Sequence, residues 1–137
     1  MNISSRCEYA CRAVLELAHH ANDPDPVTAV HIAERRHIPE KYLVHILLQL
    51  KRYGLVKSIR GALGGYMLTK SPSEITLLDL VQAIDGPVLN TLPLDENGSA
   101  ELKPVWGEVA KDISSVLEQT TIQDIVDRSA KANMYYI

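Results

Sequence analysis

The chain has 137 residues, which is enough for one domain with its own hydrophobic core. Its 46% hydrophobic and 23% charged residues are typical of a globular protein, and a net charge of −3 excludes a protein that is basic throughout. No apolar run is long enough to cross a membrane and nothing resembles a signal peptide, so we expect a cytoplasmic protein without a membrane partner.

The first predicted helix begins at Ser5 and ends near His20. Ser5 and Glu8 have the spacing of a capping box, and an apolar stripe follows at helical spacing: Tyr9, Ala10, Ala13, Val14, Leu17 and Ala18. The two cysteines, Cys7 and Cys11, would be neighbours on this helix and form no disulfide framework. They are either small core residues or a redox pair, and packing is favoured because free cysteines are commonly buried.

A helix-turn-helix follows the breaker-rich loop at residues 22–26. Thr28 is placed to cap its first helix, and Pro39 fits the first position of the next helix, which Gly54 ends. One face of that third helix is apolar and predicts core residues: Leu43, Ile46, Leu47 and Leu50.

The opposite face of the third helix and the following hairpin are the candidate DNA-binding surface. Residues 56–59 and 66–68 are strand-like, and Gly61, Gly64 and Gly65 make the turn between them. Basic groups can contact guanine edges or phosphates, and apolar groups can meet thymine methyls. The arginine at the hairpin tip suits a narrow, electronegative minor groove. The candidate residues are Lys41, Tyr42, Val44, His45 and Arg52 on the helix, with Ser58, Arg60 and Gly61 in the hairpin.

The C-terminal half predicts three more segments after a linker at residues 71–73. Thr76 and Asp79 form a capping box for a helix that Gly86 stops, and residues 88–103 read as a mobile loop. An amphipathic helix spans residues 104–118, and Thr121 caps a short last helix containing Ile122, Ile125 and Val126. The long helix either folds back on its own domain or, as we favour, forms a dimer through Trp106, Val109, Ile113, Val116 and Leu117.

These elements predict a mainly α protein with a small β-hairpin. We expect a winged helix-turn-helix domain at residues 1–86, a loop at 87–103, and a dimerisation helix with a C-terminal tail at 104–137. The glycines at 61–65 lie in a hairpin, which is the wrong context for a nucleotide-binding loop, and no nucleophile–base pair stands out. We therefore expect no enzyme activity.

No metal site or cofactor is expected either. The residues His19, His20, His31 and His37 lack the spacing of metal ligands, and the cysteine pair offers too few ligands for a closed zinc site.

The motifs together resemble the Rrf-type winged-helix transcription regulators over nearly the whole chain. The similar segments are residues 9–10, 32–35, 40–43, 54–56, 58–61, 64–66, 75–81, 84–87 and 121–125, with Trp106. The resemblance implies a homodimeric regulator, expected to be a repressor on a palindromic operator, with the third helix in the major groove and the wing in the minor groove. The alternative is a winged-helix protein-interaction module, which the acidic net charge favours, or a redox sensor that uses Cys7 and Cys11 and binds DNA weakly.

The same resemblance bears on the signal that is sensed. Sensing members place three cysteines in the loop at residues 88–103 to bind an iron–sulfur cluster, and this loop contains none. Some members use an acidic residue at the place of Glu8 as a cluster ligand, although its capping-box spacing favours a structural role here. The signal would then come from a regulatory protein, a small ligand or oxidation of the cysteines.

Overall fold

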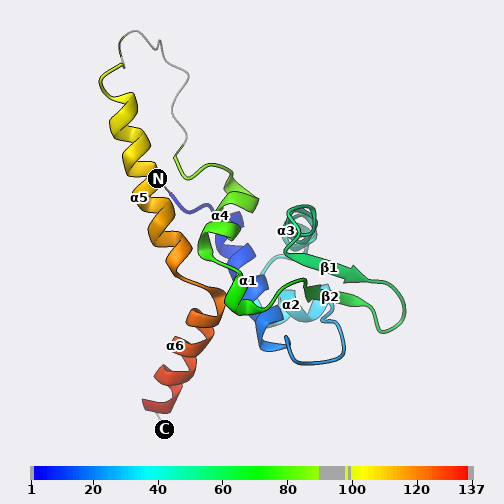
Figure 1. Cartoon of the computed structure of the whole chain (residues 1–137). Helices are drawn as coiled ribbons and strands as arrows, with labels where there is room; N and C mark the ends of the chain where they lie inside the picture. Colours follow the sequence, from blue (N-terminus) through cyan, green and yellow to red (C-terminus); the bar gives the residue numbers. More distant parts are fainter. Residues whose placement is uncertain (1, 90–97, 99, 136–137) are drawn as a thin grey trace.

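The computed structural model describes residues 2–89, 98 and 100–135 (Figure 1). Its elements follow the predicted order: α1 (Ser5–His19), α2 (Ala29–Arg36), α3 (Glu40–Arg52), β1 (Val56–Ile59), β2 (Gly65–Leu68), the 3-10 helix η1 (Pro72–Glu74), α4 (Leu77–Asp85), α5 (Lys103–Gln119) and α6 (Ile122–Tyr135). The mainly α fold with one antiparallel hairpin is confirmed. Most of the predicted mobile loop, residues 90–97 and 99, lies outside the described residues.

The cap of α1 differs from the prediction by one residue. Ser4, with extended backbone angles, accepts a hydrogen bond from the Cys7 amide (3.0 Å), so the Ser5 capping box is wrong. Glu8 instead accepts from the Arg12 side chain, its neighbour one turn later (3.3 Å). The Ser4 hydroxyl also donates to Asp85 at the end of α4 (2.6 Å), which joins the two helices.

Other local signals had mixed outcomes. Thr28 caps α2 by accepting from the His31 amide (3.2 Å), and the capping box of α4 is present, as predicted. Pro39 lies one residue before α3 rather than in it. The expected linker at 71–73 overlaps η1, whose Pro72 is buried. The last helix is 14 residues long and therefore not short.

The core is aliphatic and is formed mainly by α1, α3 and α4. The predicted inner face of α3 is completely buried. This packing explains why α3 is stable here, since a helix of this length is only marginally stable in isolation. Ile122 brings the start of α6 into the same core, and its amide donates to the Ile75 carbonyl (2.8 Å). The C-terminal helices are thus attached to the core at their junction.

The hairpin is anchored at its base by a third extended segment. β1 and β2 pair antiparallel from Val56–Leu68 to Ile59–Gly65. Val27 pairs with Tyr66 through two backbone hydrogen bonds of 3.0 and 2.7 Å. The loop before α2 and the base of the wing therefore hold each other in place.

α5 lies on the side of the molecule away from the hairpin (Figure 1). It contacts α4, but none of its residues is fully buried. Within the described residues, none of the helices combines the length and the apolarity that a membrane span needs.

Candidate nucleic-acid interface

The outer face of α3 is exposed along its whole length. Val44 is 56% exposed, and the other predicted contacts on this helix, Lys41, Tyr42, His45 and Arg52, are exposed as well. Because the inner face is fixed in the core, the helix presents one defined surface to a partner. Leu48 is also exposed there and enlarges the apolar part of the surface.

Side-chain contacts fix the position of an aromatic ring and a basic group at the start of this face. The ring of Tyr42 stacks on Tyr9 of α1, with a centroid separation of 6.3 Å. The ammonium group of Lys41 lies 5.3 Å from the centroid of the Tyr42 ring. Cation–π attraction at this distance holds the lysine near the N-terminal end of α3, where it remains exposed.

The hairpin continues the surface from the end of α3. Lys51 donates a hydrogen bond to the Ser58 hydroxyl (2.8 Å), which connects the helix to the wing. This bond uses one of the acceptor positions of the Ser58 hydroxyl. Arg60 and Gly61 are exposed at the tip. A Cβ on Gly64 would lie 2.4 Å from the Ile59 carbonyl oxygen, so this tight turn requires glycine.

Leu63 is a residue of the tip that the sequence analysis missed. It is 81% exposed, more than any other large apolar side chain among the described residues. An apolar residue within a glycine-rich turn was the available signal, because DNA-binding proteins insert such side chains into the minor groove.

The charge of this region is opposite to that of the whole chain. Residues 41–73 contain six lysines and arginines and no aspartate or glutamate, within a chain of net charge −3. A local positive field of this kind attracts phosphates regardless of the net charge.

Only part of the apolar stripe predicted for dimerisation is exposed. Trp106, Val109 and Val116 are exposed, Trp106 by 51%, whereas Ile113 and Leu117 are half-buried. Leu117 packs against the core of its own chain. The helix therefore folds back only partly and leaves an apolar face uncovered.

The two cysteines lie at the interface of α1 with the core. Cys7 is 1% exposed and Cys11 is half-buried, and neither forms a disulfide. A hydrogen bond with Cys7, together with burial, raises the pKa of Cys11. The same hydrogen bond lowers the pKa of Cys7, but this thiol is only 1% exposed, so its burial favours the packing role over redox chemistry.

Two of the chain's five histidines, His20 and His31, come together, contrary to the sequence-based interpretation. His20 and His31 meet Glu16, and one ligand atom from each residue lies within 4.8 Å of the others. Glu16 and His20 are one helical turn apart, and this spacing could have indicated that they are neighbours. His31 lies on α2, beyond the intervening loop, so its position beside them could not be predicted from spacing.

Comparisons with known proteins agree with this arrangement. A family model described as "Rrf2: Iron-dependent Transcriptional regulator" matches residues 3–128. The HTH-type transcriptional regulator CymR of Bacillus subtilis is 33% identical over 140 residues, covering 100% of both chains. The structure of CymR, the global cysteine regulator of B. subtilis, superposes with a TM-score of 0.78 at 31% identity, covering 93% of this chain and 98% of that one. The structure of T. potens IscR gives a TM-score of 0.76 at 33% identity, covering 99% and 97%.

Proposed function

Because this chain belongs to the Rrf2 family and is a DNA-binding transcription regulator rather than an enzyme, we propose that it represses transcription as a homodimer on a palindromic operator. The single observation that carries the proposed DNA geometry is the continuous, exposed and basic surface formed by α3 and the hairpin.

In the proposed complex, α3 enters the major groove. Lys41 and Arg52 are at opposite ends of the exposed face and contact guanine edges or phosphates. Val44, between them, meets the methyl group of a thymine, while Tyr42 and His45 flank the contact. The mixed basic and apolar face supports direct base readout, since a helix that touches phosphates alone needs no exposed valine.

The hairpin lies in the adjoining minor groove. Arg60 enters the groove, Gly61 allows close approach of the backbone, and Leu63 contacts the sugars or a base step. The hydrogen bond between Lys51 and Ser58 supports a fixed angle between the major-groove helix and the wing.

The dimer is proposed to form through the uncovered face of α5. Trp106, Val109 and Val116 are exposed in the single chain, and burial of such side chains is worth about 1.5–3 kcal/mol each. A twofold dimer then presents two copies of α3 to two half-sites of a palindrome.

Binding of fluorescently labelled upstream DNA tests the proposal, with Lys41→Ala and Arg60→Ala as variants. Each should weaken specific binding by about 1–3 kcal/mol, that is, about five- to 150-fold, while the unfolding free energy stays unchanged. Lys131→Ala, which removes an exposed charge from α6, is the matched control and should bind like the parent. If both variants bind as tightly as the control, the proposed interface is wrong.

A further inference from the structure

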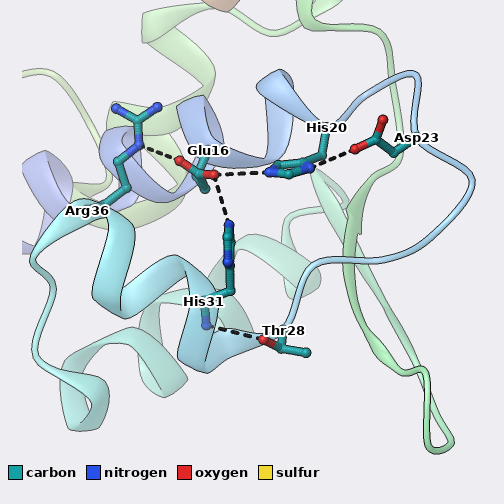
Figure 2. A network of polar contacts seen from close by, with 6 residues as sticks. All are labelled: Glu16, His20, Asp23, Thr28, His31 and Arg36. Carbon is teal, nitrogen blue, oxygen red and sulfur yellow. Dashed lines mark hydrogen bonds and ion pairs between the residues drawn. The ribbon is translucent and has the colours of Figure 1, made fainter.

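A carboxylate and two imidazoles converge between α1 and α2 (Figure 2). Glu16 is only 3% exposed on α1, and His20 follows one turn later at the end of that helix. His31 lies in the first turn of α2, where the cap at Thr28 fixes its backbone. The three side chains come from both sides of the loop at residues 22–28, and none of them belongs to the proposed DNA-binding surface.

Two of the three separations between the ligand atoms match those of a metal site, and all three atoms lie within 4.8 Å of one another. Glu16 Oε2 lies 3.1 Å from His20 Nε2 and 3.3 Å from His31 Nε2. Two ligands bound tetrahedrally at about 2.0–2.1 Å from zinc are about 3.3 Å apart. One carboxylate oxygen and two imidazole nitrogens are also a donor set that suits zinc and its neighbours in the transition series.

Both ring nitrogens of His20 face a carboxylate oxygen, which requires either a second proton on the ring or a bound metal ion. His20 Nδ1 lies 2.7 Å from Asp23 Oδ2, while Nε2 faces Glu16. A neutral imidazole has a single N–H, so one of these nitrogens presents a lone pair to a carboxylate oxygen. A second proton or a metal ion removes that repulsion. With the proton on Nδ1, Nε2 is free to bind a metal, and the aspartate is the outer partner that metal-bound histidines usually have.

The remaining oxygen of Glu16 is held by a different group. Arg36 Nε donates to Oε1 at 2.9 Å, which orients the carboxylate and leaves Oε2 for the two imidazoles (Figure 2). If protons alone compensated the site, His20 would be an imidazolium ion, and a neutral His31 would donate from Nε2 to Glu16. A metal ion would instead bind both rings in the neutral form, and the acidic side chains of Asp23 and Asp25 on the same pocket would offset its charge.

The site is also accessible. His20 and His31 line an open pocket of about 480 Å³ whose other wall is formed by residues 23–28. Their side chains are 31% and 45% exposed, so an ion can enter and a water molecule can complete a tetrahedron as the fourth ligand. The same loop pairs with the wing through Val27 and Tyr66, which places the ion beside the base of the wing.

We propose that Glu16, His20 and His31 bind a divalent transition-metal ion of the zinc class, with three protein ligands and one open position. The ion joins α1 to α2 and fixes the loop that supports the hairpin. This site differs in residues and chemistry from a thiolate-bound iron–sulfur cluster, because it contains no sulfur ligand.

Titration of the tag-free, metal-stripped full chain with Co²⁺ tests the proposal. We expect one Co²⁺ per chain, the visible d–d absorption of a nitrogen- and oxygen-bound tetrahedral ion, and its displacement by Zn²⁺. His20→Gln and His31→Gln should each lower the affinity at least tenfold, while His19→Gln, an exposed neighbour outside the cluster, should leave it unchanged. At the same concentration, Zn²⁺ should raise the Tm of the parent and the control more than that of the two variants.

Three results would overturn the proposal. The first is the absence of a stoichiometric Co²⁺ spectrum in the parent, and the second is its full retention in both variants. The third is a sulfur-to-cobalt charge-transfer band, which would place the ion at the cysteines. X-ray absorption of the Zn²⁺-loaded parent gives the same decision without any variant. Two imidazoles and no sulfur in the first shell support the site, and any other shell contradicts it.

Discussion

The close approach of β2 to the loop before α2 makes Gly65→Ala a sharp test of how the wing is supported. A Cβ at position 65 would lie 2.4 Å from the Val27 carbonyl oxygen and 2.6 Å from its carbonyl carbon. Both obstacles are backbone atoms, so the two segments must separate. Their separation breaks the two hydrogen bonds between Val27 and Tyr66, which are 3.0 and 2.7 Å long.

The cost follows from those two bonds. Each contributes about 0.5–1.5 kcal/mol net, so Gly65→Ala should lower the free energy of unfolding by about 1–3 kcal/mol. Urea unfolding measures this, and DNA affinity should fall as well because the hairpin loses its anchor. Gly98→Ala is the control, since its Cβ would meet no atom within 4 Å. If the two variants differ from each other by less than about 0.5 kcal/mol, the anchoring role of this contact is refuted.

Three further outcomes are expected. Val116→Asp, which places a charge in the uncovered face of α5 at a cost of several kcal/mol on burial, should give monomers by light scattering, whereas Ser115→Asp, outside that face, should not; an unchanged dimer would remove α5 from the interface. Burial raises the pKa of Glu16, but hydrogen bonds from Arg36 and His20 outweigh it and hold the pKa below its ordinary value. The parent should therefore be more stable than Glu16→Gln at neutral pH, and this difference should vanish as the pH falls through the lowered pKa. A difference that persists in acid would contradict this. The anaerobically purified protein should be colourless and its DNA affinity indifferent to nitric oxide, and a peroxide response that survives in the Cys7→Ser, Cys11→Ser double variant would exclude the thiols as the sensor.

The sequence was most informative where one periodic pattern decided the structure. The inner face of α3 and the hairpin were predicted because apolar residues repeat at helical spacing and glycines punctuate the turn. The spacing of Ser5 and Glu8 favoured a capping box at Ser5, and only the extended backbone of Ser4 shows that the cap lies one residue earlier. The length of α6 was missed because few apolar residues follow Val126.

Features that depend on distant segments could not be read from local patterns. Glu16 and His31 are separated by a loop, so their meeting depends on how α1 and α2 pack. The anchoring of the wing by Val27 also depends on the packing of distant segments, because Val27 pairs with Tyr66.

The salt dependence of operator binding tests the central account most directly. Each neutralised phosphate contributes a slope of about −0.9 to the plot of log affinity against log salt concentration. A dimer that contacts DNA with α3 and the wing of both subunits should give a steep slope, and Lys41→Ala should reduce it by about one per subunit if Lys41 contacts a phosphate. A flat dependence, or Lys41→Ala and Arg60→Ala variants that bind as tightly as the parent at every salt concentration, would contradict the assignment of this surface to DNA.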